Sequence, residues 1–355
     1  MRDQINNHWP AGGTECVSNC PVCGSFENTP MHGDLSDLTF NVAPGTWAMV
    51  RCNDCRSGYL DPRPTAATIG LAYTNYYTHA DTGENNDGGI AKFRRGIASS
   101  YANGKLGTHF AGEIMFGHVF TWFLPRLRRY LDVRYRRHLP DAHRAGNYRR
   151  LLDVGCGNGE FLACASALGW LAEGIDIDPA AVAAALTAGY SAKVTDLNDP
   201  LLKPESYDQI TLSHVIEHMA APREQLKRCL DLLSPNGRLW LQTPNIDSVG
   251  HNVFGAAWRG LEPPRHLVLF NRPALQEMLS DVGFVDIEFK AHPAVPLFIW
   301  EESRQILKRM PFLQRNGIFS RLSQMLPAAV FADYWSVMNP DSAEFLTCIA
   351  FRPNT

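Results

Sequence analysis

The sequence predicts an α/β fold, with a parallel sheet covered by helices on both faces and a small cysteine-containing ribbon in front of it. Residues 151–162 combine a strand, a glycine turn and a helix start, and strand and helix patterns go on alternating to residue 245. Two Cys-x-x-Cys pairs precede residue 56. Alternation of this kind is typical of parallel sheets, because each parallel strand needs a crossover connection.

The glycine turn is the first element of the predicted sheet. Leu151, Leu152 and Val154 form a short apolar strand, followed by three glycines. These are Gly155, Gly157 and Gly159. Without a Cβ they let backbone amides approach a ligand, and the helix start that follows favours a nucleotide. The Gly-x-Gly-x-Gly spacing differs from the Gly-x-Gly-x-x-Gly fingerprint of nicotinamide and flavin binders.

Carboxylates follow the next two predicted strands. Asp176 lies near the end of the apolar stretch 171–178, where a side chain can accept both ribose hydroxyls of an adenosine. Asp196 follows the strand 192–195 and could read an adenine edge, although ordinary turn chemistry explains it nearly as well. With Ser213 and His214 after the fourth strand, these residues should converge on one crevice at the carboxyl ends of the strands.

Four stretches in this order resemble the class I S-adenosylmethionine-dependent methyltransferases: 151–162, 174–178, 207–218 and 234–245. The resemblance implies a Rossmann-like sheet of seven strands and S-adenosyl-L-methionine as cofactor. Asp153, at the end of the first strand, is expected to support the glycine turn, and its carboxylate to reach the amino end of the cofactor. The cofactor-binding residues that the resemblance implies are Asp153, Gly155, Gly157, Gly159, Asp176, Ile177, Asp196, Leu197 and Ser213.

The two cysteine pairs predict a structural zinc site. Cys20, Cys23, Cys52 and Cys55 supply the four soft donors of a tetrahedron, and four cysteines leave no open position for catalysis. Residues 37–42 and 47–51 are expected to be strands of this ribbon. Cys16 and His32 have poorer spacing and are interpreted as bystanders. The cysteine pairs followed by residues 59–64 resemble a subset of the same methyltransferases that carries an N-terminal zinc ribbon.

Composition narrows the class of protein. The chain has 355 residues, a formal net charge of −3 and nine cysteines, without an N-terminal export pattern or a long uncharged apolar run. The charge argues against a general attraction to nucleic acid, and the free thiols favour a cytoplasmic protein. We therefore expect no secretion and no spanning helix.

We expect three regions: a zinc ribbon at 1–64, a helical linker or cap at 65–149, and the methyltransferase domain at 150–355. Residues 110–150 join an apolar helix to nine arginines between Arg126 and Arg150. This segment is interpreted either as a helix packed on the core or as a basic surface for peripheral membrane contact or phosphate. A helical insertion at 292–342 is expected to form a lid, a substrate-side wall or a dimer surface.

Two histidines are candidates for the general base. His266 lies in a Pro-Pro-Arg-His stretch that resembles the family's meeting point of substrate and cofactor, and its pKa is expected near the working pH if little perturbed. His214 is the second candidate, and His218 is interpreted as structural. A histidine that merely caps a loop is the alternative for all three.

The function that we predict from the sequence is methylation of a small molecule. O-methylation of a sugar, a glycan or lipid-linked precursor, or a specialised metabolite is favoured. One alternative is an RNA methyltransferase that grips phosphates with the ribbon and the arginines, and another is an inactive zinc-ribbon binding module. The acceptor and the oligomeric state are left open.

Overall fold

The computed structural model describes residues 8–74, 89–115, 117–142, 149–290, 297–310 and 338–354. The chain divides into two compact units, each built from several stretches of sequence. The first unit contains Met1–Tyr76, His214–Lys227 and Leu241–Cys348. The second contains Tyr77–Ser213, Arg228–Trp240 and Ile349–Thr355.

The predicted α/β sheet is confirmed. Its seven strands run in the order β12-β13-β10-β9-β6-β7-β8. Their bounds are β6 Arg150–Val154, β7 Leu171–Asp176, β8 Ser191–Val194, β9 Tyr207–Ser213, β10 Leu233–Pro244, β12 Val285–Phe289 and β13 Phe345–Phe351. The pairs β6–β7, β6–β9 and β7–β8 are parallel, so four strands present their carboxyl ends at one edge.

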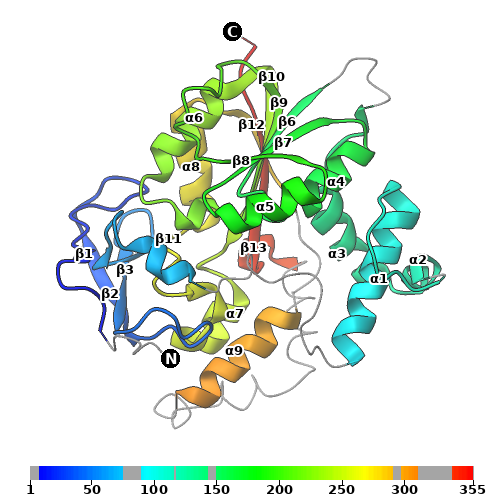
Figure 1. Cartoon of the computed structure of the whole chain (residues 1–355). Helices are drawn as coiled ribbons and strands as arrows, with labels where there is room; N and C mark the ends of the chain where they lie inside the picture. Colours follow the sequence, from blue (N-terminus) through cyan, green and yellow to red (C-terminus); the bar gives the residue numbers. More distant parts are fainter. Residues whose placement is uncertain are drawn as a thin grey trace. The chain divides into compact units, whose positions relative to one another are not determined.

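Helices alternate with the strands, and two of them begin at a capping side chain. They are α4 Glu160–Ala167, α5 Pro179–Thr187, α6 Pro222–Leu232 and α8 Arg272–Val282. The Asp178 carboxylate caps α5 by accepting the Ala180 N–H, and Asn271 caps α8 in the same way. Figure 1 shows α5 lying across the strands around β8, and α5 contacts both β7 and β8.

The second unit has its own apolar core beside the glycine turn. Helices α1 Gly89–Leu106 and α3 Pro125–Arg136 pack with α4 there. The core side chains include Tyr101, Leu131, Tyr135, Leu151, Phe161 and Trp170. The part of residues 110–150 formed by α3 is therefore packed on the sheet domain, as one of the two interpretations expected.

The cysteine-containing ribbon lies in the first unit and is completed from far along the chain. Its sheet has the order β11-β4-β3-β2. The strands are β2 Asn28–Leu35, β3 Trp47–Cys52, β4 Gly58–Leu60 and β11 Val268–Leu269, and their pairs are antiparallel. The strand expected at 47–51 is confirmed, but the one expected at 37–42 is wrong. The Asp37 carboxylate accepts the N–H groups of Phe40, Val42 and Ala43 and bends that segment into a turn.

Part of the expected insertion at 292–342 is a helix, α9 Leu297–Arg309. Trp300 of α9 is buried, and its indole N–H donates to Glu344, 3.1 Å away, just before β13. Residues 292–296 and 311–337 of the expected insertion lie outside the described residues. Among the helices that the structure describes, none is long and apolar enough to cross a membrane.

Candidate cofactor and metal sites

The glycine turn after β6 takes the backbone conformation that the sequence predicts. The φ angles of Gly155, Gly157 and Gly159 are +70°, +55° and +83°, values that residues with a Cβ rarely adopt. The Gly155 N–H donates to the Ile175 carbonyl at 2.8 Å, which ties the turn to β7. The turn therefore passes directly beside the end of the neighbouring strand.

Asp176, the last residue of β7, braces this turn. One carboxylate oxygen accepts the Gly157 N–H at 2.9 Å, and the other accepts the Asp178 N–H at 3.0 Å. Burial raises the pKa of the carboxyl, while these two backbone N–H groups act in the opposite direction. Each carboxylate oxygen has a further lone pair, so Asp176 retains the capacity to accept hydroxyl groups of a ligand.

Asp153 is fully buried within β6 and is held by two side chains. Its Oδ1 accepts the Thr211 hydroxyl at 2.6 Å and forms an ion pair with Arg137. The Arg137 guanidinium lies 3.8 Å from the centre of the Phe161 ring. Burial raises the pKa of the Asp153 carboxyl, and Arg137 opposes this shift. No local pattern singles out this partner, since Arg137 is one of nine arginines in its segment.

The other predicted cofactor residues follow the carboxyl ends of the parallel strands. Ile177 is 69% exposed directly after β7, and Leu197 is buried beyond β8. Asp196 is exposed and accepts the Asn198 N–H at 2.7 Å, which is the turn chemistry considered above. Ser213 is half-buried at the end of β9. The structure thus brings Gly155, Asp176, Asp196 and Ser213 to one edge of the sheet.

His214 begins the part of the first unit that follows β9. It adopts a positive φ of +56°, and its N–H donates to the Gln242 carbonyl at 2.8 Å. Its Nδ1 lies 3.3 Å from the carboxylate of Glu217, which is completely buried. The His214 side chain itself is 37% exposed, so it can meet a ligand from solvent.

His266 and His218 lie together, with ring centres 4.8 Å apart. The Nδ1 atom of His266 lies 2.7 Å from the Gly260 carbonyl, and that of His218 lies 3.0 Å from the Arg265 carbonyl. Burial lowers the pKa of His266 to about 4. His266 is only 5% exposed, so the condition attached to a pKa near the working pH, a little-perturbed imidazole, is not met. Its role as general base stays a prediction.

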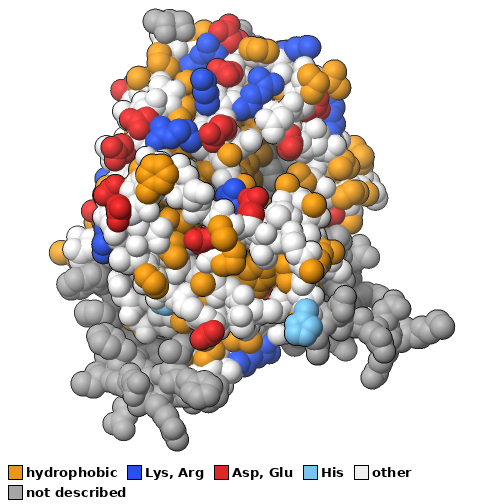
Figure 2. Space-filling view, turned by 90° about the vertical axis from the view of Figure 1, so that its left-hand side faces the viewer, with side chains coloured by type: hydrophobic (Ala, Val, Ile, Leu, Met, Phe, Trp, Pro, Cys, Tyr) orange, Lys and Arg blue, Asp and Glu red, His pale blue; other side chains and the backbone are white. Residues whose placement is uncertain are grey.

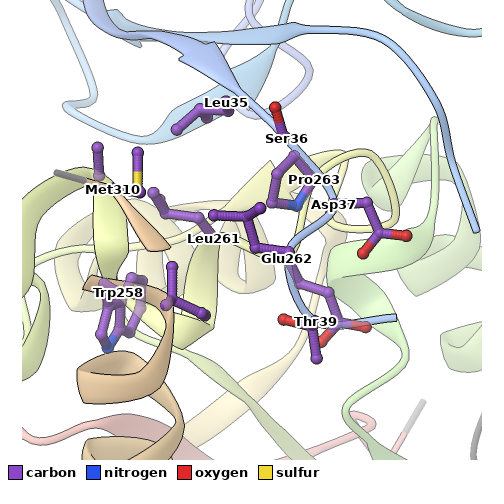
Figure 3. A pocket seen from close by; sticks show the side chains of 12 residues that line it. Leu35, Ser36, Asp37, Thr39, Trp258, Leu261, Glu262, Pro263 and Met310 are labelled. Atoms are coloured by element: carbon purple, nitrogen blue, oxygen red, sulfur yellow. The ribbon is translucent and has the colours of Figure 1, made fainter. Parts of the chain in front are cut away.

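A buried ion network holds the loop that carries His266. Arg265 is fully buried and pairs with both oxygens of Asp37, at 2.5 and 3.1 Å, and with Glu262 at 3.0 Å. Glu262 also pairs with Arg259. Asp37 and Glu262 line a pocket with Trp258 and Leu261 (Figure 3). Buried charges need such partners, so this network fixes the loop against the ribbon sheet.

The four predicted cysteine ligands come together. The Sγ atoms of Cys20 and Cys55 are 3.6 Å apart, and those of Cys23 and Cys52 are 3.5 Å apart. A tetrahedral zinc ion with Zn–S bonds of about 2.3 Å separates its sulfur ligands by about 3.8 Å. The cluster therefore fits zinc. Cys16 is exposed and outside the cluster, and the Nε2 atom of His32 lies 2.9 Å from that of His251.

Comparison with known proteins agrees with the sheet and its glycine turn. Residues 125–288 match the family described as "Methyltransferase domain". The chain is similar to the ubiquinone biosynthesis O-methyltransferase of Burkholderia pseudomallei strain 1710b, at 28% identity over 174 residues, which is 44% of this chain and 75% of that protein. The protein of the same name from Burkholderia orbicola strain MC0-3 is 31% identical over 158 residues, covering 41% and 66%.

Among solved structures, a SAM-dependent methyltransferase from Archaeoglobus fulgidus aligns at 21% identity with a TM-score of 0.43. This alignment covers 65% of the present chain and 99% of the archaeal one. The family match and the curated relatives support a methyltransferase of the S-adenosylmethionine-dependent class. Residues 125–288 contain β6, β7, β8 and β9, and hence the glycine turn and Asp176.

Proposed function

We propose that this protein transfers a methyl group from S-adenosyl-L-methionine to an oxygen of a small molecule. The observation that carries the proposal is the glycine turn braced by Asp176, which lies inside the segment that matches a methyltransferase domain. The turn offers backbone close to a ligand, and Asp176 offers lone pairs for ribose hydroxyls. The nine cofactor residues predicted from the sequence belong to this proposal, eight as cofactor contacts and Asp153 as the support of the glycine turn.

The cofactor supplies a methyl group that its sulfonium already activates. The chain therefore has to bind the cofactor and the acceptor, orient them, and remove one proton from the acceptor hydroxyl. Asp176 would hold the ribose, and Ile177, Asp196 and Leu197 would surround the adenine. Positioning of reactants can lower a barrier by about 7 to 11 kcal/mol. Asp153 is paired with Arg137 and Thr211, which favours support of the turn over contact with the amino end of the cofactor.

His214 is the better placed of the two candidate bases. Its ring is partly exposed and faces the buried Glu217 carboxylate through Nδ1, which leaves Nε2 to accept a proton from the acceptor hydroxyl. The carboxylate would stabilise the imidazolium that forms. His266 is buried, and its lowered pKa makes it a weak base.

O-methylation of a small molecule is supported by the names of the curated relatives, which are O-methyltransferases. The arginine segment gives less support to RNA. Arg134, Arg137 and Arg150 are paired with Glu160, Asp153 and Glu173. On the face seen in Figure 2, basic and acidic side chains are intermixed, without a broad area of positive charge. Sugars, glycan or lipid-linked precursors and specialised metabolites are the acceptor classes that we favour.

We also propose that the four cysteines bind a structural zinc ion, since their sulfur spacing fits a tetrahedron and all four positions are filled by the chain. Zinc would join the turns at Cys20–Cys23 and Cys52–Cys55 and so stabilise the ribbon sheet.

Peripheral membrane contact is proposed for the segment just before α3. Met115, Trp122 and Phe123 are 82%, 71% and 78% exposed, and the exposed Arg129 follows on α3. Exposed aromatic residues beside arginines suit an anionic lipid surface. Sedimentation with phosphatidylglycerol vesicles should show binding that Trp122→Ser weakens. Equal recovery of wild type and variant would reject this contact.

Isothermal titration with S-adenosyl-L-methionine and S-adenosyl-L-homocysteine tests the main proposal. Asp176→Asn should weaken binding at least about tenfold, which corresponds to about 1.4 kcal/mol. Asp178→Asn is the matched control, because it removes one negative charge two residues away and keeps a side chain that can cap α5. If the wild-type protein bound neither compound, the proposed function would be rejected.

A further inference from the structure

Three side chains outside the cysteine cluster gather in the first unit. Glu217, His218 and His266 each offer a ligand atom within 4.8 Å of the other two. Glu217 is fully buried, His266 is buried and His218 is partly exposed. The Leu267 N–H donates to the Glu217 carbonyl at 2.8 Å, so a backbone hydrogen bond joins the two loops that carry these side chains.

The hydrogen bonds of the two histidines determine which nitrogens carry protons. Each Nδ1 faces a backbone carbonyl, Arg265 for His218 and Gly260 for His266. The Tyr73 hydroxyl also lies 3.0 Å from the His218 Nδ1, and a hydroxyl can accept as well as donate. A carbonyl oxygen only accepts, so the bonds to the two carbonyls place the proton on each Nδ1, and each Nε2 of the neutral rings presents a lone pair. Metal-binding histidines have this arrangement, in which the second ring nitrogen donates to a carbonyl or a carboxylate.

The Glu217 carboxylate adds a third acceptor. Its Oε2 accepts the Thr243 hydroxyl at 3.0 Å, whereas Oε1 makes no aligned hydrogen bond to any residue that the structure describes. His214 Nδ1 approaches Oε1 to 3.3 Å, and Glu262 lies 3.7 Å from His266 Nε2. Acceptor atoms gathered in a buried place are stabilised by a cation or by further donors, and Glu217 Oε1 has no aligned donor among the described residues.

We propose that Glu217, His218 and His266 bind a divalent first-row transition metal ion. Two imidazole nitrogens and one carboxylate oxygen are donors of intermediate hardness, which suit Mn²⁺, Fe²⁺, Co²⁺ or Zn²⁺. Three protein ligands leave a coordination position open, and the partly exposed His218 marks the side on which water or a hydroxyl oxygen would enter. A hydroxyl bound to such an ion loses its proton more readily. This last consequence rests on the proposed function, while metal binding does not.

Manganese is the probe that separates this cluster from the cysteines, because Mn²⁺ favours oxygen and nitrogen over thiolate ligands. The full-length protein, treated with chelator and reloaded with one equivalent of Zn²⁺, is titrated with Mn²⁺ without S-adenosyl-L-methionine. Loss of the electron paramagnetic resonance signal of free Mn²⁺ measures binding. We expect one ion per chain in the wild type.

Glu217→Gln keeps the shape of the side chain and should weaken Mn²⁺ binding at least about tenfold. His32→Gln is the matched control, because it removes an imidazole of the same unit outside the cluster, and it should bind like the wild type. Absence of Mn²⁺ binding to the wild type, or unchanged affinity in Glu217→Gln, would overturn the proposal.

A second measurement needs no variant and so does not depend on correct folding of Glu217→Gln. Wild-type protein loaded with two equivalents of Co²⁺ should show two absorption signatures, one with sulfur-to-metal charge transfer and one typical of nitrogen and oxygen ligands. If all bound Co²⁺ had sulfur ligands, the proposed site would be rejected. Cofactor binding measured on protein reloaded with one equivalent of Zn²⁺ and no other metal tests the proposed function separately.

Discussion

The cysteine cluster and the Glu217–His218–His266 cluster lie in the same unit and differ in the number of donor atoms that they offer to a metal ion. The first offers four sulfur atoms from two tight turns, enough for a complete tetrahedron around a metal ion. The second offers three donor atoms, from residues 217–218 and from a loop 48 residues beyond His218. The number of ligands therefore separates a structural site from one able to accept a further ligand.

A third arrangement shows how two imidazoles are satisfied without an ion. His251 Nδ1 lies 2.6 Å from the Ile246 carbonyl, so His251 Nε2 is an acceptor. His32 Nε2 lies 2.9 Å away and can donate its proton to that acceptor. This histidine pair is complete by itself. In the cluster around Glu217, His214 Nδ1 approaches Oε1 to 3.3 Å, but among the described residues no aligned hydrogen bond reaches that oxygen.

The largest effect is expected from removing one cysteine of the cysteine cluster. Cys52→Ser removes a fully buried ligand and should release zinc and unfold the ribbon sheet, since zinc binding contributes about 10 to 16 kcal/mol in small zinc-dependent peptides. Metal analysis and thermal unfolding would measure this. Cys16→Ser is the control because Cys16 is exposed and outside the cluster. Retention of zinc and of the melting temperature by Cys52→Ser would contradict the structural role.

The next largest effect concerns the loop that carries His266 of the Glu217–His218–His266 cluster. Arg265→Met should lower the free energy of unfolding by about 3 to 5 kcal/mol, because Asp37 and Glu262 would lose a buried cation. Urea unfolding would measure it. Arg272→Met removes an arginine paired with the exposed Asp341 and should change stability by about 1 kcal/mol or less. Equal losses in the two variants would show that the buried network does not hold the loop.

The smallest effect is a pH dependence that belongs to the histidine pair. Burial, with His251 as a second cause, lowers the pKa of His32 to about 4, and burial also lowers that of His251, which Arg51 and Asp247 influence in opposite directions. The unfolded chain then binds more protons, so the stability present above about pH 6.5 is lost as the pH falls toward 4.

Urea midpoints measured between pH 7.5 and 5 would show this slope, and His32→Gln should reduce it. An unchanged slope would mean that other groups govern the acid sensitivity. The same variant is expected to leave Mn²⁺ binding intact. The two measurements together therefore distinguish the His32–His251 pair from the Glu217–His218–His266 cluster.

Local patterns explain what could be predicted from the sequence. The glycine turn, the strand ending at Asp176 and the two cysteine pairs each lie within a few residues, so spacing alone indicates their conformation. For that reason the α/β sheet could be predicted, and the structure confirms it. The zinc ion and the cofactor contacts stay predictions.

Contacts between distant residues explain what the sequence did not reveal. Nothing local indicates that Arg137 pairs with Asp153 or that Arg265 pairs with Asp37. The burial of His266, and with it the lowered pKa, follows from the loops around it. The strand expected at 37–42 is wrong because alternation of apolar residues there is overridden by the hydrogen bonds of Asp37.

The pairing of β4 with β11 has a consequence for how the protein is made. Val268 lies opposite Tyr59 and Leu269 opposite Gly58, so the ribosome must synthesise about two hundred further residues before the ribbon sheet gains its last strand. A gene fragment that encodes only the first 64 residues would leave β4 with an uncovered edge. A fragment that starts after residue 64 would lack β4. The strand β11, which begins two residues after His266, would then have no partner.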